Sequence, residues 1–540
     1  MTIRSLFDAA VLNYPHAPFM TWKRDKAWHT RTYTEATLRI RQLSEAFHKL
    51  KFKPQSTPVA LVLENGPEWL ESYQALAGAG IVVVPIDPKL HAKEMAHILA
   101  NSEACGIVAS RTLAALLETI LPNLPNLKTV IFTDYGYPPP RLHPNVTAHD
   151  FTELFLSVRG ESLTFFDKNT PNTNDIASII YTSGTTGKPK GAMLSHGNFY
   201  HDAIGSYDGF EKNLFHSDEF LVVLPYFHCF SFMTNFVFPL LKGCHLVFVE
   251  ALRTVADDFK RHRCSALMAV PLLAEKIYLR IEEKLNKSRM ARILVKVGLG
   301  HIVGRKIIKN LGGKLRCICT GGAPCPIHIV QGFKKLGIGI IEGYGLTECS
   351  PVVAMSHVRT HRPGTIGRPL NNIEIRLANP NENGIGEIQV KGQNVMLGYY
   401  NNEEATNNTF TKDGWLKTGD LGTIDKDNNI FIRGRSKDML LSASGQNIYP
   451  EEIEAKLNNL PYVGDSLVVD RNKKLVALVC PDHDIVKQDG ISEYDLQKIM
   501  NENLVILNRM VASYEKIAEI QLTDEFVKTP KKSIKRYLYK

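Results

Sequence analysis

Short apolar segments, most of them ending in or closely followed by proline or glycine, recur along the chain, and they constrain its fold more than any other feature. The first are VALVL at 59–63 and GIVVVPIDP at 80–88. Later segments of the same kind are IASIIYTSG, LVVLP, HLVFVE, ALMAVP and LRCICTGG. Continuous apolar runs that alternate with helical patterns are typical of parallel sheets covered by helices. We therefore predict an α/β fold that binds its ligands where these strands end, at one edge of a sheet.

The chain has 540 residues, and single hydrophobic cores stop growing near about 250–300 residues, so we expect at least two domains. From about residue 364 the sequence changes to short strands and Asn/Gly/Asp turns, which predict a small antiparallel β unit at about 364–436. Two strand patterns and two helical patterns follow. We expect a large N-terminal domain at 1–436, with stacked, mostly parallel sheets, covering helices and the β unit, and a small α+β domain at 437–540.

The formal net charge is +9, and ten basic residues without an acid fall in the basic segment 284–316. Such a segment forms either a solvated helix face or a helix that rests on an anionic membrane surface. No aromatic residues that could stack on bases lie between these charges, so we do not expect nucleic acid as a partner.

The stretch 220–241 contains no Asp, Glu, Lys or Arg and is long enough to span a membrane. Pro225, Asn235 and Pro239 interrupt it, and it begins with the strand-like LVVLP. We therefore predict a buried strand, a turn and a buried helix.

The nine cysteines are odd in number and scattered, and the N-terminus does not resemble a secretory signal. We expect a reducing, cytoplasmic environment. Cys317 and Cys319 alternate in LRCICTGG, and no second pair follows at zinc-ligand spacing, so we expect both in the core.

The strongest local signal is TSGTTGKPKG at 182–191, which directly follows a predicted strand. Its glycines allow backbone N–H groups to turn toward an anion, and hydroxyls and Lys190 add donors and charge. The loop is not the common GxxxxGK[ST] type, because Pro189 follows Lys188. We predict that it binds a polyphosphate.

The longer run YTSGTTGKPKGAMLSH resembles the phosphate loop of the AMP-binding superfamily of acyl-CoA synthetases, luciferases and peptide-synthetase adenylation domains. The resemblance extends over nearly the whole chain. KTGDLGTID and SASGQNIYPEEIE are most similar to bacterial long-chain fatty acyl-CoA synthetases. The resemblance implies ATP or AMP, Mg²⁺ and coenzyme A as ligands, and a mobile C-terminal domain that rotates about a hinge at Lys437.

EGYGLTE at 342–348 resembles the adenine and magnesium motif of the family. The resemblance implies that Tyr344 stacks on adenine, that Thr347 contacts the α-phosphate, and that Glu348 ligates magnesium together with Thr182. Carboxylate and hydroxyl oxygens suit this hard cation. The implied nucleotide- and cofactor-binding residues are Thr182, Ser183, Gly184, Thr185, Thr186, Gly187, Lys190, Gly321, Gly322, Ala323, Pro324, Glu342, Gly343, Tyr344, Gly345, Thr347, Asp420, Ile432, Arg435 and Gly445.

Other roles follow from the same resemblance. Asp420 in TGD matches the carboxylate that binds the ribose hydroxyls, and Arg435 matches an arginine that meets ribose or phosphate. His228 in LPYFH lies either between the nucleotide and acyl pockets or in the core. Gly445 matches the position that leaves room for a pantetheine arm. The implied catalytic residues are Lys190, His228, Thr347, Glu348, Arg435 and Lys532.

The sequence departs from the family near its C-terminus. Where the family carries a lysine that contacts the carboxylate and phosphate, TPKKSIKR aligns Ser533 without a gap. A shift by one residue places Lys532 there, and we predict that Lys532 partly substitutes.

We expect activation of a carboxylic acid to acyl-AMP and then to acyl-CoA, with a medium- or long-chain fatty acid as substrate. Aryl acids, an acyl-AMP ligase that loads a carrier protein, and a catalytically weakened homologue that binds nucleotide or acyl-AMP stay open as alternatives. A peripheral contact with the inner face of the membrane and a homodimer also stay open. Four phenylalanines close to His228 in the sequence either line an acyl tunnel or belong to the core. They are Phe227, Phe230, Phe232 and Phe236.

Overall fold

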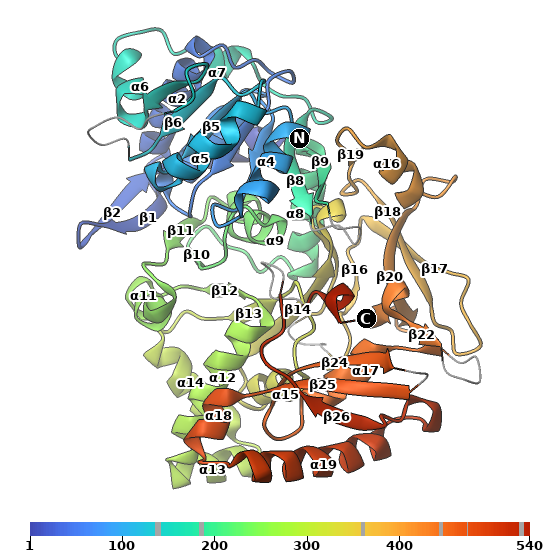
Figure 1. Ribbon diagram of the computed structural model, residues 1–540. Coiled ribbons are helices and arrows are strands. Elements are labelled where there is room, and N and C mark those ends of the chain that lie inside the picture. Colours follow the sequence, from blue (N-terminus) through green and yellow to red (C-terminus); the bar gives the residue numbers. More distant parts are fainter. Residues whose placement is uncertain are drawn as a thin grey trace. The chain divides into compact units, whose positions relative to one another are not determined.

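A computed structural model of the chain shows the predicted α/β architecture (Figure 1). It describes residues 1–134, 142–182, 188–357, 362–441, 447–471, 474–528 and 534–539. The chain forms two compact units. The first unit is Met1–Glu374 with Val390–Leu416, and the second unit is Ile375–Gln389 with Lys417–Lys540. The predicted domain boundary between residues 436 and 437 stays a prediction, and so does the predicted hinge at Lys437.

One sheet of the first unit has eight strands in the order β19-β9-β8-β4-β3-β5-β6-β7. Their bounds are β3 Val59–Val62, β4 Val83–Pro85, β5 Gly106–Ala109, β6 Thr129–Phe132, β7 Thr147–Asp150, β8 Ile176–Thr182, β9 Lys190–Ser195 and β19 Gly398–Tyr399. The strands from β8 through β7 pair in parallel, whereas β9 pairs antiparallel with both β8 and β19. The apolar runs found in the sequence are therefore interior strands, as predicted.

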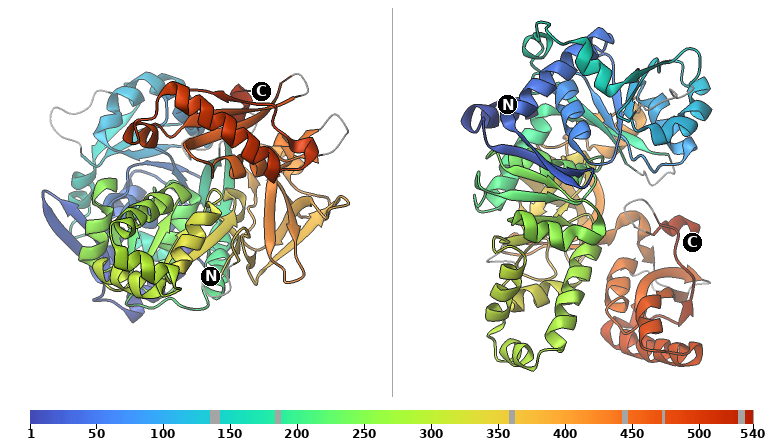
Figure 2. Two further views of the ribbon diagram at one scale, coloured as in Figure 1. Left: turned by 90° about the horizontal axis from the view of Figure 1, so that it is seen from below. Right: turned by 90° about the vertical axis from the view of Figure 1, so that its left-hand side faces the viewer.

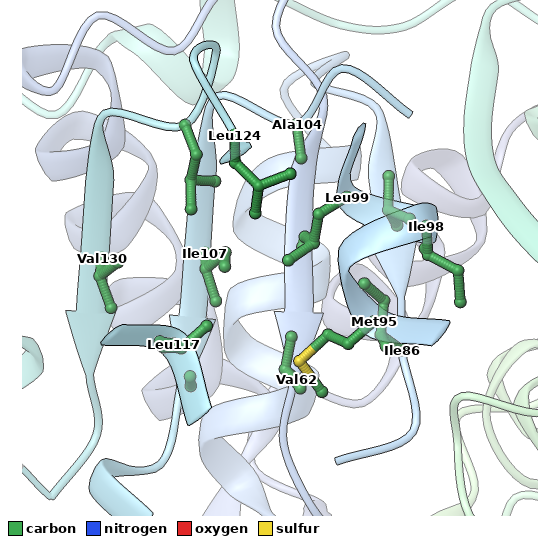
Figure 3. Close-up of a cluster of buried hydrophobic side chains, with 14 of the residues drawn as sticks. Val62, Ile86, Met95, Ile98, Leu99, Ala104, Ile107, Leu117, Leu124 and Val130 are labelled. Carbon is green, nitrogen blue, oxygen red and sulfur yellow. The ribbon is translucent and has the colours of Figure 1, made fainter. Parts of the chain in front are cut away.

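Helices α4 (Ala92–Asn101) and α5 (Ala114–Ile120) cover one face of this sheet (Figure 3). Met95 and Leu99 of α4 and Leu117 of α5 pack with Ile107 and Val130 of the strands, and all five are buried. Met95 and Leu99 are four residues apart, so they project from the same face of the helix.

The other sheet of the first unit has nine strands in the order β16-β15-β14-β13-β12-β10-β11-β1-β2. Their bounds are β1 Pro18–Arg24, β2 Ala27–Thr32, β10 Glu219–Val222, β11 His245–Phe248, β12 Ala266–Ala269, β13 Cys317–Thr320, β14 Gly339–Gly345, β15 Val352–Met355 and β16 Arg368–Pro369. The strands from β1 through β14 are parallel along β1-β11-β10-β12-β13-β14. Cys317 and Cys319 are buried in β13, as expected for core residues.

The uncharged stretch 220–241 folds as predicted into a strand, a turn and buried helical segments. After β10, the chain forms α9 (Cys229–Phe232), a π-helical turn (Met233–Val237) and α10 (Phe238–Leu240). Phe232 is buried with its ring 4.6 Å from that of Tyr73. Among the described residues, no helix combines the length and apolar character that a bilayer crossing requires.

Helices α12 (Pro271–Asn286), α13 (Arg289–Lys296), α14 (Gly300–Asn310) and α15 (Ile327–Lys335) pack beside the second of these sheets (Figures 1 and 2). Gly300 and Gly304 lie directly against the C-terminal end of α15. A Cβ at Gly304 would lie 1.7 Å from the carbonyl oxygen of Leu336, and one at Gly300 would lie 2.1 Å from that of Lys335. The two glycines therefore fix which face of α14 points outward.

The second unit combines a four-stranded sheet with a three-stranded sheet. The strands are β17 Ile373–Ala378, β18 Gly386–Gly392, β20 Leu416–Ile424, β21 Ile430–Arg435, β24 Val463–Arg471, β25 Lys474–Pro481 and β26 Glu519–Leu522. Helices α17 (Pro450–Leu457) and α19 (Glu493–Met510) contribute buried side chains to the same core as β24 and β25.

Candidate functional site

Strands β8 and β9 close the base of the predicted phosphate loop. They pair antiparallel, and Thr182 and Lys190 are the last Cα partners before the chain leaves the ladder. The predicted loop residues Ser183, Gly184, Thr185, Thr186 and Gly187 lie outside the described residues. The structure thus places the hydroxyl of Thr182 and the ammonium of Lys190 on adjacent strands, at the two ends of the loop.

Tyr399 joins this pair to the predicted magnesium ligand Glu348. Its Cα pairs with that of Ala192 in β9, and its ring centroid lies 5.4 Å from Lys190 Nζ. Its hydroxyl donates a 2.7 Å hydrogen bond to Glu348 Oε1. Burial, with the neighbouring carboxylate second, raises the pKa of Tyr399 above its usual range, so the hydroxyl stays protonated and remains a donor. Lys190, Tyr399 and Glu348 therefore form one polar cluster.

Tyr399 was not among the site residues predicted from the sequence, although GYY at 398–400 is a signal. A glycine before two tyrosines, shortly after a strand, indicates a close backbone approach with a polar aromatic beside it.

The donors at this cluster fit a magnesium ion. Oε1 of the half-buried Glu348 accepts from Tyr399, and a carboxylate has further lone pairs for a cation. No group of three or more His, Cys, Asp or Glu side chains in the described parts of the chain could hold a metal ion. One carboxylate with one hydroxyl is typical of Mg²⁺, which is usually held by few protein ligands together with substrate phosphates and water.

The residues predicted to lie along adenine meet at the ends of β13 and β14. Thr320 pairs with Glu342 across these strands. A Cβ at Gly321 would lie 3.1 Å from the ring of Phe230 and 3.4 Å from the carbonyl oxygen of Gly343. Glycine at 321 therefore lets the segment after β10 approach the ends of β13 and β14. Among the other predicted residues, Gly322, Ala323 and Pro324 are exposed, and Tyr344 is half-buried.

His228 lies at the start of α9, in the same segment as Phe230. Its backbone N–H donates to Pro225 O, and its carbonyl accepts from Phe232 N–H at 3.0 Å. Its ring is 4.6 Å from that of Phe227, in an edge-to-face arrangement. Its catalytic role stays a prediction.

Thr347 and Glu348 belong to a tight 3₁₀ turn (Thr347–Cys349) that directly follows β14. The backbone N–H of Met396 donates to the carbonyl of Glu348 at 2.8 Å. Nδ2 of the fully buried Asn394 donates to the Cys349 carbonyl at 2.7 Å, and Ser350 Oγ donates to the Asn394 carbonyl. This backbone bonding holds the turn, and with it the Glu348 side chain, against the segment that carries Tyr399.

Asp202 supports the same turn from helix α8 (His196–Gly209). Its Oδ1 accepts from the backbone N–H of Val352 at 3.1 Å and from Asn394 Nδ2 at 3.2 Å. Its Oδ2 is buried and has no hydrogen-bond partner within the described chain. Burial raises the pKa of Asp202 well above its usual range, which favours the neutral form of the carboxyl. Neither Asp202 nor Asn394 was among the residues predicted from the sequence.

Asp420 and Arg435 lie in the second unit. They are Cα partners in β20 and β21, and Arg435 Nε lies 2.7 Å from Asp420 Oδ1. Asp420 is buried, whereas Arg435 is exposed. Ile432 is half-buried opposite Gly422. The predicted residues Gly445 and Lys532 lie outside the described residues, and the ligand roles of the others stay predictions.

The family model for the AMP-binding enzyme matches residues 7–400. This chain belongs to the AMP-binding enzyme family. The resemblance to the AMP-binding superfamily, which YTSGTTGKPKGAMLSH indicated, is thereby confirmed. The chain is 30% identical to the long-chain-fatty-acid–CoA ligase FadD15 of Mycobacterium bovis over 482 residues, which cover 84% of this chain and 77% of that protein. It is 26% identical to the 2-succinylbenzoate–CoA ligase of Bacillus pumilus over 532 residues, which cover 96% of this chain and 93% of that protein.

Two solved structures share the fold of this chain. ATP-bound MatB from Rhodopseudomonas palustris matches with a TM-score of 0.78 at 23% identity, over 100% of this chain and 98% of that chain. The o-succinylbenzoate coenzyme A synthetase MenE from Bacillus subtilis, in complex with ATP and magnesium, matches with a TM-score of 0.75 at 23% identity, over 98% of both chains. The predicted fold class is therefore confirmed.

Proposed function

We propose that this protein is an ATP-dependent acid–CoA ligase that forms an acyl-AMP and then an acyl-CoA. The family match and the CoA ligases among its relatives support an AMP-forming acid–CoA ligase. The single observation that carries the proposal is the cluster of Lys190, Tyr399 and Glu348 at the base of the Thr182–Lys190 loop. It combines a fixed cation with a carboxylate that suits magnesium, where a polyphosphate-binding loop begins and ends.

In the first half-reaction, a carboxylate oxygen of the substrate attacks the α-phosphorus of ATP, and the bond to the β-phosphate breaks to release pyrophosphate. Lys190 neutralises the negative charge that develops on the phosphate oxygens, while Thr347 donates to the α-phosphate. Magnesium, held by Glu348 and Thr182, would supply further positive charge. In the second half-reaction, the thiol of coenzyme A attacks the acyl carbon, and AMP leaves.

We assign the remaining roles as the family resemblance implies them. Tyr344 stacks on adenine, and the backbone of 321–324 lies along its edge. Asp420 accepts from the ribose hydroxyls, and Arg435 meets ribose or phosphate. His228 separates the nucleotide from the acyl group, and Gly445 leaves room for the pantetheine arm.

We propose a medium- or long-chain fatty acid as the substrate. Long-chain fatty acid ligases from mycobacteria and mammals are 28–30% identical to this chain over 84–88% of its length, which supports this choice. The alternative is an aryl acid, because the 2-succinylbenzoate ligase matches over more of both chains. A fatty acid partitions into bilayers, so a surface that holds the protein at a membrane would bring it to such a substrate.

The test is pyrophosphate release across a panel of acids from acetate to oleate, with benzoate and 2-succinylbenzoate, in the presence and absence of coenzyme A. We expect the highest kcat/KM with a medium- or long-chain fatty acid, and thioester formation on free coenzyme A. Activity confined to aryl acids would overturn the substrate proposal. Acyl-AMP formation without transfer to free coenzyme A would favour a carrier protein as the acceptor, and nucleotide binding without pyrophosphate release would favour a catalytically weakened homologue.

A further inference from the structure

The basic segment 284–316 forms the end of α12, all of α13 and α14, and the chain that leads into β13 (Figure 1). Three of its ten bases are paired with acids: Lys287 with Glu283, Lys314 with Glu219 and Arg316 with Asp218. The other seven make no ion pair within the described residues. They are Lys284, Arg289, Arg292, Lys296, Arg305, Lys306 and Lys309, and all seven are exposed. The segment therefore presents uncompensated positive charge to its surroundings.

Exposed apolar side chains accompany this charge on α13. Met290 is 70% exposed, Ile293 is 50% exposed and Val297, just past the helix, is 62% exposed. At positions i, i+3 and i+7, these three residues lie on one side of the helix. The opposite side is occupied, because Val295 packs against the core cluster that α12, α14 and α15 share. The apolar stripe thus points away from the core.

The basic side chains of α13 form a second stripe beside the first. Arg289, Arg292 and Lys296, again at i, i+3 and i+7, each precede or follow a member of the apolar stripe by one residue. An apolar stripe next to Lys and Arg is typical of helices that lie in a membrane interface. Nucleic acid or an acidic protein would account for the charge, but neither requires three neighbouring apolar side chains that face solvent.

Helix α14 continues this surface. Ile302 and Leu299 are 45% and 41% exposed, next to the exposed Arg305 and Lys306. The close contact of Gly304 with the Leu336 carbonyl keeps this face of α14 turned outward. In Figure 1, α13 lies at one end of the group that it forms with α12 and α14.

We propose that α13 and the first turns of α14 bind the surface of an anionic phospholipid bilayer. Met290, Ile293 and Val297 enter the boundary between headgroups and acyl chains, and Arg289, Arg292 and Lys296 contact lipid phosphates. The inference goes beyond the proposed catalytic function, because it concerns binding and holds for any substrate.

The test is co-sedimentation of the full chain with vesicles of phosphatidylcholine alone and of phosphatidylcholine mixed with phosphatidylglycerol. We expect binding to the anionic vesicles only. Replacement of Arg289, Arg292 and Lys296 by Gln should lower the partition coefficient on the order of a hundredfold, and M290S/I293S/V297S should lower it at least about tenfold. The loss of binding caused by the Gln replacements should shrink at high salt, whereas the loss in M290S/I293S/V297S should persist.

The matched control is L12S/L156S/L252S, which removes three leucines of the same unit that are 81%, 57% and 73% exposed. It should bind anionic vesicles as the wild type does. All variants should keep wild-type ATP–pyrophosphate exchange, which shows that they fold, because none of these residues lies in the proposed catalytic site. Three outcomes would each overturn the proposal. The wild type could bind both vesicle types alike, or the control could lose as much vesicle binding as M290S/I293S/V297S. In the third, the protein binds heparin and M290S/I293S/V297S loses no vesicle binding.

Discussion

At the scale of single residues, Tyr399 is the side chain that links Lys190 to Glu348, the proposed magnesium ligand. Tyr399→Phe keeps the ring next to Lys190 and removes the donor to Glu348. Since a hydrogen bond to a charged group contributes about 1.5–3 kcal/mol, we expect ATP–pyrophosphate exchange to fall roughly tenfold to a hundredfold.

The neighbouring tyrosine is the matched control for this prediction. The hydroxyl of Tyr400 donates to Glu103, outside the cluster. Tyr400→Phe should therefore exchange pyrophosphate at nearly the wild-type rate. Equal rates for both variants would show that the Tyr399 hydroxyl does not position Glu348.

Asp202 gives a prediction about pH. Its pKa in the folded protein is raised by burial above the unfolded value of about 3.9. The folded protein keeps a proton that the unfolded chain releases above about pH 4, so Asp202 lowers the free energy of unfolding as the pH rises toward the folded pKa. Asp202→Asn removes this titration and keeps the shape of the side chain.

We therefore expect the stability of Asp202→Asn, relative to the wild type, to increase by up to about 1.4 kcal/mol per pH unit above about pH 4. Chemical denaturation at a series of pH values measures this difference. A difference that is constant between about pH 4 and pH 7 would mean that Asp202 is ionised in the folded protein.

The residues that sequence analysis found and those that it missed differ in a physical way. Lys190, Thr347 and Glu348 lie in runs rich in glycine and hydroxyl side chains, whose local composition suits phosphate and magnesium. Tyr399 acts only because a strand of two residues, too short to leave a periodic pattern, pairs with β9. Asp202 is a single acid in a helix, and sequence periodicity does not show that the Val352 backbone and Asn394 meet it there.

At the scale of elements, the C-terminal stretch TPKKSIKR differs from the family pattern at Ser533. The described residues on either side of it, Lys528 and Ile534, are paired with each other. Ile534 directly follows Ser533, forms a bridge with Lys528 and packs against the core cluster that contains Val469. Arg536 bonds to the buried Glu454, whose pKa burial raises to about 7. These contacts of Ile534 and Arg536 hold the backbone that follows Ser533 in place.

Lys532 lies two residues before the anchor at Ile534, and we expect it to supply part of the missing charge. Lys532→Ala should lower ATP–pyrophosphate exchange, because loss of one preorganised stabilising group costs about 3–4 kcal/mol at full effect. Ser533→Lys should raise the rate. Lys531→Ala, one residue further away, is the control; an unchanged rate in Lys532→Ala would refute the substitution.

At the scale of the whole molecule, the recurring apolar runs predicted the α/β fold because each is an interior strand. The sequence did not show that 375–389 and 417–436 group with the C-terminal residues, because that grouping depends on contacts between distant segments. Strand order was equally inaccessible, since β8 pairs with β4 across three intervening strands in the chain.

Substitutions at Lys437 test the proposed hinge. Lys437 is exposed in a 3₁₀ turn, Ser436–Asp438. Proline fixes φ near about −65°, so Lys437→Pro should block a rotation that requires a large backbone change at this residue. We expect one half-reaction to persist and the other to fall at least about tenfold, measured by pyrophosphate exchange and by thioester formation from acyl-AMP. Lys437→Ala should retain both; equal losses of both half-reactions in Lys437→Pro would exclude a hinge here.

The antiparallel ladder of β8 and β9 determines which insertions the chain tolerates. A one-residue slip in this ladder would turn Lys190 to the opposite face of the sheet, away from Tyr399. An insertion between Thr182 and Lys190 leaves that ladder intact, because added loop residues cost little in closure entropy. We therefore expect relatives of this protein to tolerate insertions between Thr182 and Lys190, whereas an insertion within either strand would separate Lys190 from Tyr399.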